Sequence, residues 1–312
     1  MNIETTFKAF ETAFLVRTVE TLIAKNYKKG FMRCPTHLSI GQEIVPAILN
    51  CFFDQKDLAV SSHRSHAHYL GKRGSIEKLF NEIHGLSSGC SGGKGGSMHL
   101  IDKSVGFMGS TAIVGNTIPI GVGLSQAQKL LEEHNLTYIF LGDGATEEGV
   151  FYESLNYAAV KKLPCIFIIE NNEYSVYTSL KERQGNLSIE SKFKGFNTFF
   201  AKNDNHDFNL LYDDWKKAIS HCKNKNGPAI IEIKTHRYLE HCGPNEDDQL
   251  GYRPDELLQK WANLDILTLL ENQLLEDNYD CLEIKKKKSE IETCCNELFH
   301  KAEEMHISQR EK

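Results

Sequence analysis

Long apolar runs and an excess of positive charge are both missing from this sequence. No stretch reaches membrane-spanning length, and the polar start at residues 1–5 lacks the features of a signal peptide. The 36 basic and 42 acidic residues give a net charge of -6, which argues against unaided binding to nucleic acid. The basic block at residues 285–288 is expected on the solvated face of a helix. We therefore expect a cytoplasmic protein with neither a nucleic-acid nor a membrane partner.

Paired cysteine motifs are missing as well. The nine cysteines are an odd number, and none belongs to a CxxC pair that has a partner pair. Cys294 and Cys295 are direct neighbours, an arrangement poorly suited to a structural bridge. Reduced thiols in a cytosolic protein are the simplest interpretation.

Motifs for nucleoside triphosphates and nicotinamide cofactors are also missing. The pair Gly93-Lys94 lacks the earlier glycine that a Walker loop requires, since Ser88 stands at that position. Both glycine pairs that could open a GxGxxG fingerprint lack its last glycine, because Gln126 and Glu147 stand there. The pattern therefore disfavours a kinase or a nicotinamide-dependent dehydrogenase.

What the sequence does contain is the pattern of a parallel α/β fold. Residues 137–141 and 165–169 are two apolar runs, separated by residues 147–161, which have helical periodicity. Strands that are apolar throughout and joined by a helix indicate a parallel sheet with helices on both faces. Further strands are expected at residues 58–60 and 229–233.

Several helices should surround this sheet. We predict them at residues 5–28, 41–49, 75–82 and 207–224, and again from about residue 255 onward. Residues 85–123 are rich in glycine and almost without periodicity, so they are expected to form a long functional loop. The predicted organisation is an α/β cofactor-binding domain over residues 1–265 and a helical extension over residues 266–312.

Polar residues follow the two apolar runs where each predicted strand ends. The first run leads into Gly142-Asp143-Gly144, and the second into Asn171-Asn172. Ligands of open parallel sheets bind at the carboxyl ends of strands, so Asp143 and Asn172 should face one crevice. Carboxylate and amide oxygens suit magnesium, and flanking glycines let the backbone approach an anion. Each motif alone is also common in ordinary turns. Their combination favours magnesium with a diphosphate.

These residues resemble a known family, the alpha chains of thiamine-diphosphate-dependent 2-oxo-acid dehydrogenase and acetoin dehydrogenase first components. The likeness runs in order from about residue 10 to residue 260. It comprises residues 37–43 (HLSIGQE), 92–99 (GGKGGSMH), 112–115 (AIVG), 142–144 (GDG), 153–156 (ESLN) and 171–172 (NN). His63-Arg64 stands where pyruvate dehydrogenases usually have Tyr-Arg, which favours the acetoin-type branch.

The resemblance implies how the metal and the diphosphate would be held. Asp143 and Asn172 would bind Mg²⁺ through their side chains, and Tyr174 through its backbone carbonyl. Gly144 and Ala145 would lie along the diphosphate.

Other cofactor contacts follow from the same resemblance. Arg64, with His63 beside it, would neutralise phosphate oxygens by charge-assisted hydrogen bonds. Backbone at Ala112 and Val114 would hold the aminopyrimidine of the cofactor. The family often has glycine where this chain has Ala112.

Three histidines would line the reaction centre according to the resemblance. His37, His66 and His241 would orient substrate, stabilise charge or transfer protons near neutral pH. His241 also lies in a segment similar to the mobile loop that covers the diphosphate in the family, and so counts among the cofactor-binding residues. An alternative for His63, His66 and His68 is a metal cluster on one short loop.

The family needs a glutamate that a separate beta chain supplies, so the resemblance implies an alpha-two-beta-two assembly that is active only with that partner. The reaction would decarboxylate a 2-oxo acid or cleave an acetoin-like 2-hydroxyketone, and would pass the adduct to a lipoyl acyltransferase or another acceptor. Residues 240–244 depart from the common dehydrogenase loop. A transketolase-like carbon–carbon ligation in a biosynthetic pathway is therefore the alternative reaction. An assembly scaffold is the non-enzyme alternative.

Overall fold

The computed structural model describes residues 1–310 except Arg33 and Asn197. The chain forms two compact units whose segments alternate along the sequence. The helical unit comprises Met1–Phe52, Arg64–Asp102 and Arg237–Lys312, and the sheet unit comprises Phe53–His63 and Lys103–His236.

The sheet unit is built on six strands that pair only in parallel. Their order across the sheet is β2 (Phe107–Ser110), β1 (Leu58–Ser61), β3 (Thr137–Gly142), β4 (Cys165–Asn171), β8 (Ala229–Lys234) and β7 (Phe199–Asn203). The central strands are buried along nearly their whole length, which explains their uninterrupted apolar sequences. The predicted parallel α/β fold is confirmed.

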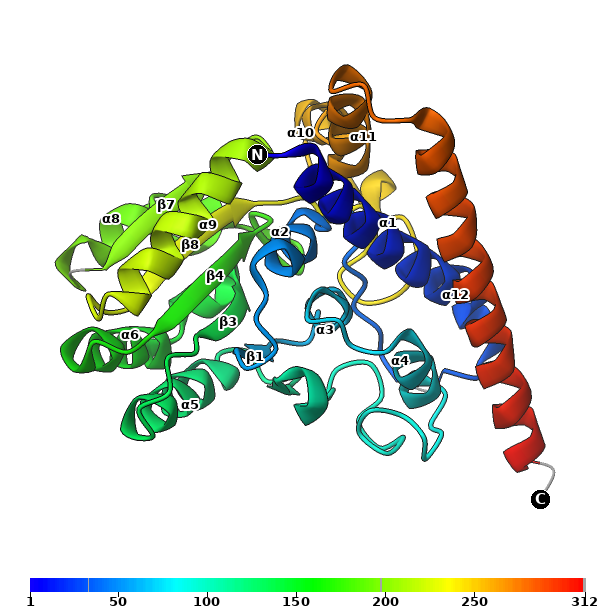
Figure 1. The fold of residues 1–312 in the computed structure, drawn as a ribbon, viewed down its shortest axis with the longest axis horizontal. Helices are drawn as coiled ribbons and strands as arrows, with labels where there is room; N and C mark the ends of the chain where they lie inside the picture. The colour runs from blue at the N-terminus through cyan, green and yellow to red at the C-terminus, as the bar shows by residue number, and fades with distance from the viewer. Residues whose placement is uncertain (33, 197, 311–312) are drawn as a thin grey trace. The chain divides into compact units, whose positions relative to one another are not determined.

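Helices cover both faces of this sheet. α5 (Thr117–Leu130) and α6 (Gly149–Lys161) pack side by side, as Figure 1 shows. They share one apolar core with the odd-numbered strand residues Ile139, Phe167 and Ile169. On the opposite face Tyr138 stacks on Trp215 of α9 (Phe208–Lys223), with 6.0 Å between the ring centroids. Side chains along β3 alternate between the two faces of the sheet, so they contribute to two separate cores.

Glycine lets α5 lie close to the strands. A Cβ atom added at Gly121 would stand 2.6 Å from Cγ1 of Ile139 and 2.8 Å from Cγ2 of Val60. Both distances are too short for carbon atoms, and both neighbours are fully buried. Any larger residue at Gly121 would push the helix off the sheet.

The helical unit is organised around α1 (Ile3–Asn26). Its buried side chains include Ala9, Phe10, Ala13 and Val16, which recur at helical spacing. The other helices of this unit are α2 (Ile44–Phe52), α3 (His66–Gly71), α4 (Ile76–Ile83), α10 (Asp255–Ala262), α11 (Ile266–Glu276) and α12 (Cys281–Arg310). α1 contacts α2, α11 and α12, and the long α12 runs beside it in Figure 1.

A partly buried arginine joins three of these segments. Arg17 on α1 donates hydrogen bonds to both carboxylate oxygens of Glu43 and to Oδ1 of Asp265, the latter over 2.7 Å. Asp265 is also the N-cap of α11, since its side chain accepts from the backbone N–H of Thr268. One guanidinium thus links α1, the start of α2 and the start of α11.

The glycine-rich segment after α4 is held by a single carboxylate. Glu82, fully buried near the end of α4, accepts four backbone N–H bonds, from Ser91 (2.7 Å), Gly93 (2.9 Å), Gly95 (2.7 Å) and Gly96 (3.2 Å). Gly93 has a φ of +73°, and an added Cβ there would meet the Leu86 carbonyl oxygen at 2.5 Å. Four amide dipoles offset the cost of burying this charge.

The prediction of one long loop over residues 85–123 is wrong in its second half. β2 and the start of α5 lie there. Three of the four glycines at positions 109, 115, 121 and 123 fall inside these elements, where they weaken the apolar period without preventing the structure. β7 and a small hairpin, β5 (Tyr174–Ser175) with β6 (Thr178–Ser179), were also not predicted.

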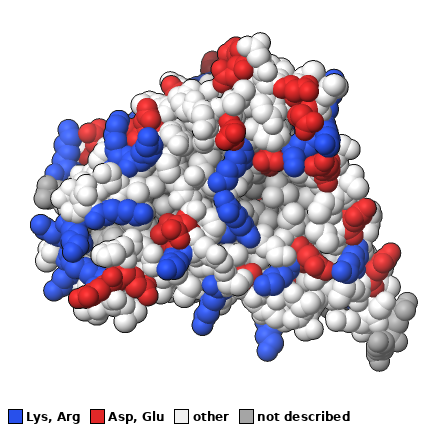
Figure 2. Space-filling view, viewed as in Figure 1, with Lys and Arg blue, Asp and Glu red and all other residues white. Residues whose placement is uncertain are grey.

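The surface carries charges of both signs. On the face shown in Figure 2, basic and acidic side chains lie interspersed. Among the described residues, no helix combines the length and the apolar character that crossing a bilayer requires.

Glu82→Gln tests the role of this buried carboxylate. The amide keeps the shape of the side chain but points an NH₂ group at backbone donors. We expect the free energy of unfolding to fall by about 2–4 kcal/mol, measured by urea denaturation. Glu77→Gln on the same helix is the control, because its pair with Lys301 is exposed and should contribute under about 1 kcal/mol. Equal losses for the two variants would contradict this role.

Candidate functional site

Asp143 and Asn172 follow two strands that are direct neighbours. In the parallel register of β3 and β4, Gly142 lies opposite Glu170. Asp143 is the next residue after β3, and Asn172 follows the last residue of β4. Both residues therefore leave the sheet at the same edge, the carboxyl edge, as their sequence positions predicted.

The Asp143 carboxylate is buried and has a cationic partner. The residue is only 2% exposed, and Arg183 donates a hydrogen bond from Nη2 to its Oδ2. Burial raises the pKa of Asp143, and the hydrogen bond and charge of Arg183 oppose that rise. The hydroxyl of Thr146 donates to the Asp143 carbonyl over 2.7 Å and fixes the turn that follows.

The turn after β3 is a 3₁₀ helix over Asp143–Glu147, and α6 begins only at Gly149. Gly144 is half-buried, and an added Cβ would lie 3.3 Å from Oγ of Ser175 and 3.7 Å from Nη1 of Arg183. The side chain of Ala145 packs into the core beneath the sheet edge. Only the backbone of Ala145 is thus available to a ligand.

Asn172 begins the hairpin that carries Tyr174. Its Oδ1 accepts the backbone N–H of Tyr174 over 3.1 Å. Glu173 and Val176 have positive φ values of 67° and 57°, an uncommon conformation for residues with side chains. This tight path turns the chain back so that β5 and β6 pair.

The remaining predicted residues of the sheet unit are Ala112, Val114 and His63. Ala112 and Val114 lie in the loop between β2 and α5, where Val114 is 45% exposed. His63 is half-buried in the loop after β1. Their proposed contacts with the aminopyrimidine and with phosphate oxygens stay predictions.

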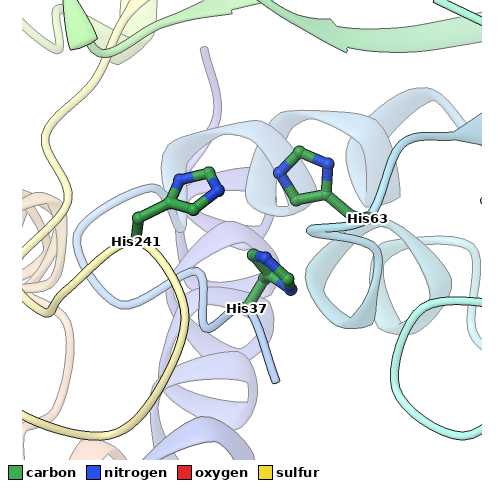
Figure 3. Close-up of side chains that lie close together, drawn as sticks. All are labelled: His37, His63 and His241. Carbon is green, nitrogen blue, oxygen red and sulfur yellow. The ribbon is translucent and has the colours of Figure 1, made fainter. Parts of the chain in front are cut away.

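Arg64, His37 and His241 lie together in the helical unit. The buried guanidinium of Arg64 donates hydrogen bonds to the backbone carbonyls of Leu38 and His241, the latter over 3.0 Å. The rings of His37 and His241 meet edge to face, with centroids 5.0 Å apart (Figure 3). Arg64 therefore links the two segments that carry these histidines.

His66 has a different environment from the other two histidines. It is fully buried on α3, with Nδ1 3.3 Å from Glu20 and Nε2 2.8 Å from the Ser97 hydroxyl. Both ring nitrogens of His66 have hydrogen-bond partners, so neither is available as a metal ligand in this arrangement. This disfavours the alternative of a metal cluster formed by His63, His66 and His68. A catalytic role for His66 stays a prediction, and its contacts are those of a positioning residue.

Sequence reasoning did not identify Arg183 or Glu82. Arg183 lies 40 positions after Asp143, on a segment without a recognisable motif. The helical periodicity of residues 75–82 identifies Glu82 only as the end of a helix. A signal for Glu82 did exist, since a glycine-rich loop packed against a helix exposes backbone N–H groups that require an acceptor.

The fold and this sheet edge define a parallel α/β protein with polar residues at the carboxyl ends of two neighbouring strands. The family described as Dehydrogenase E1 component matches residues 11–311 of the chain. The chain belongs to this family, as an alpha chain of the thiamine-diphosphate-dependent 2-oxo-acid dehydrogenase type. The resemblance drawn from the sequence motifs is confirmed.

Curated relatives agree with this assignment. The chain is 36% identical over 288 residues to the pyruvate dehydrogenase E1 component subunit alpha of Rickettsia bellii, covering 91% of this chain and 87% of that one. It is 35% identical over 272 residues to the subunit of the same name from Rickettsia conorii, covering 87% and 82%. The Rhizobium meliloti subunit is 33% identical over 257 residues, covering 82% and 73%.

His66→Ala tests whether this histidine positions other groups. The change leaves the buried Glu20 carboxylate without its imidazole partner, so we expect a loss of about 3–5 kcal/mol in the free energy of unfolding. His99→Ala, at an exposed histidine, should cost less than about 1 kcal/mol. Chemical denaturation measures both. A fully stable His66→Ala chain that loses only turnover would instead favour a catalytic role.

Proposed function

We propose that this chain is the alpha subunit of an enzyme that binds thiamine diphosphate through Mg²⁺ and acts on a small 2-oxo acid, with pyruvate as the first substrate to test. The family supports the cofactor class, and the names of the relatives support the substrate. The observation that carries the proposal is the common edge of β3 and β4, where Asp143 and Asn172 leave the sheet. The cofactor-binding part would lie within residues 1–265, with residues 266–312 as a C-terminal extension that does not contact the cofactor.

The residues at this edge suit a magnesium diphosphate. Asp143 is 2% exposed, and a buried carboxylate needs hydrogen-bond donors or a cation to offset its charge; Mg²⁺ would be such a cation when diphosphate oxygens complete its shell. Asn172 adds a neutral amide oxygen, and the backbone carbonyl of Tyr174 would add a third protein ligand. Gly144 carries no side chain between the 3₁₀ turn and the hairpin, so the backbone there can approach an anion.

The protein's own part of the reaction is binding, orientation and proton handling. Bound thiamine diphosphate would supply the carbanion chemistry that cleaves the bond next to the carbonyl group. Arg64 and His63 would hold phosphate oxygens, and backbone at Ala112 and Val114 would orient the aminopyrimidine. His37 and His241, whose rings touch, would hydrogen-bond the substrate and exchange protons near neutral pH.

A beta chain would complete the active site. The family's activating glutamate comes from that second chain, so we propose an alpha-two-beta-two assembly. A lipoyl acyltransferase is the proposed acceptor of the product group.

Two other reactions have specific support from the sequence. His63-Arg64 favours cleavage of an acetoin-like 2-hydroxyketone, and residues 240–244 differ from the common dehydrogenase loop, which favours a transketolase-like ligation. Turnover of pyruvate, acetoin and a ligation pair by the same alpha–beta complex separates the three.

Asp143→Asn tests the metal site directly. Loss of the negative charge should weaken Mg²⁺-dependent binding of thiamine diphosphate at least tenfold, about 1.4 kcal/mol or more, measured by calorimetry with the beta chain present. Asp213→Asn, an exposed carboxylate on α9, should bind as the unchanged chain does. Unchanged affinity in Asp143→Asn would contradict the proposed site. Absence of binding even in the unchanged complex would favour the scaffold alternative.

Co-expression tests the need for a partner. We expect the purified chain to show no turnover alone and full turnover when combined with the beta chain, measured by release of CO₂ from pyruvate. The reason is that the activating glutamate belongs to the other chain. Full turnover by this chain alone would contradict the proposal that a beta chain is needed to complete the active site.

A further inference from the structure

Arg183 is shared between two acidic side chains at the proposed metal site. Its Nη2 donates to Asp143 and its Nη1 to Glu147. The Arg183 side chain is 10% exposed, that of Asp143 3% and that of Glu147 29%. The guanidinium therefore joins a buried carboxylate to one that is partly open to solvent.

The chain fixes Arg183 in this position through local structure. It is the last residue of the short helix α7 (Leu180–Arg183), which directly follows the hairpin that carries Tyr174. Ser179 and Glu182 form a capping box that sets the start of α7. The backbone N–H of Leu180 donates to the carbonyl of Glu173 over 2.7 Å, and Nε of Arg183 donates to the carbonyl of Thr178 over 3.1 Å. The segment that follows Asn172 therefore places the guanidinium of Arg183 next to Asp143.

Positive side chains compensate part of the negative charge at this place. Asp143 and Glu147 provide two negative charges, and Arg183 provides one positive charge. Lys192, whose ammonium group donates to Gln184, is a second positive charge nearby, and Glu232 is a third negative one. A free divalent cation that approaches Asp143 meets a guanidinium already on the carboxylate and is repelled by it. A metal bound to a diphosphate instead brings negative charge that can attract the guanidinium.

We propose that Arg183 is an exchangeable counter-ion: it neutralises Asp143 while no metal is bound and leaves that carboxylate when the metal–diphosphate enters. The inference rests on the proposed function, because it takes Asp143 as a metal ligand. Glu147 serves as the pivot, since Nη1 can keep its bond to Glu147 while Nη2 moves from Asp143 toward a phosphate oxygen. Nη1 lies 3.7 Å from a Cβ position at Gly144, so the guanidinium already lies over the backbone that would border the diphosphate.

This arrangement would have two consequences. A buried carboxylate without a cation would destabilise the metal-free chain, and Arg183 removes that cost. The same contact makes the site select a metal that arrives with an anion over the bare ion, because only the former offers Arg183 a new partner.

Binding of Mn²⁺ alone, followed by electron paramagnetic resonance on the full chain, tests the exchange. Arg183→Gln removes the competing cation and keeps a polar side chain, so the loss of charge repulsion should raise the affinity for Mn²⁺ about tenfold. Lys181→Gln is the matched control, because it removes one positive charge from the same short helix at an exposed position and should leave the affinity unchanged. Asp143→Asn reports whether Mn²⁺ binds at the proposed site at all.

The outcomes separate the inference from the proposed function. If Mn²⁺ binding depends on Asp143 but is equal or weaker in Arg183→Gln, the exchange is overturned and the metal site stands. If Mn²⁺ binding does not depend on Asp143, the proposed metal site itself fails. If the affinity for Mn²⁺ rose equally in Lys181→Gln, the rise would reflect the overall charge of the protein and not the contact of Arg183 with Asp143. That result would also overturn the inference.

Thermal unfolding gives a second, independent measurement. Without metal, Arg183→Gln should melt at a lower temperature than the unchanged chain, and saturating Mn²⁺ should raise its melting temperature more. Arg183→Lys keeps one positive charge without the two-armed geometry and should be intermediate in both measurements. This variant also serves if Arg183→Gln does not fold. A melting temperature that responds to Mn²⁺ equally in all three proteins would contradict the exchange.

Discussion

The parallel pairing of β3 with β4 is the constraint on which the proposed cofactor site depends. Because both strands run in the same direction and in register, their following residues must leave the sheet at one edge. α5, α6 and α9 hold these strands in place from both faces, and Gly121 allows α5 to approach closely. The position of Asp143 relative to Asn172 is therefore set by backbone hydrogen bonds and core packing, not by the loops.

Buried acidic groups in this protein receive different kinds of partner. Glu82 is surrounded by four backbone N–H groups, Glu43 by the guanidinium of Arg17, and Glu20 by the imidazole of His66. Each of these contacts joins separate segments of the chain and serves a structural purpose. Asp143 differs in its place at the carboxyl edge of the sheet. Its partner Arg183, like Arg17, is shared with a second and more exposed carboxylate.

The sequence allowed the central strands and the flanking helices to be predicted, since apolar runs and helical periodicity report burial directly. β3, β4 and β8 lie where such runs stand, and Ser75 caps α4 as expected. β2 and α5 were missed because glycines interrupt the pattern that would have identified them. Arg183 was missed for a different reason: its position follows from a hairpin with positive φ at Glu173 and Val176, which no residue pattern announces. Contacts that depend on such turns can be identified only from a three-dimensional structure.

The alternation of the two units along the chain has a consequence for protein synthesis. The sheet unit ends at His236, whereas the helical unit needs residues 237–312 as well as the first 52 residues. On the ribosome, the apolar stripe of α1 is therefore made first but meets α11 and α12 last. During that interval the part of the α1 surface that packs on α11 and α12 stays exposed on a nascent chain whose sheet can already assemble. Apolar surface that is exposed in this way before folding is complete is prone to aggregation.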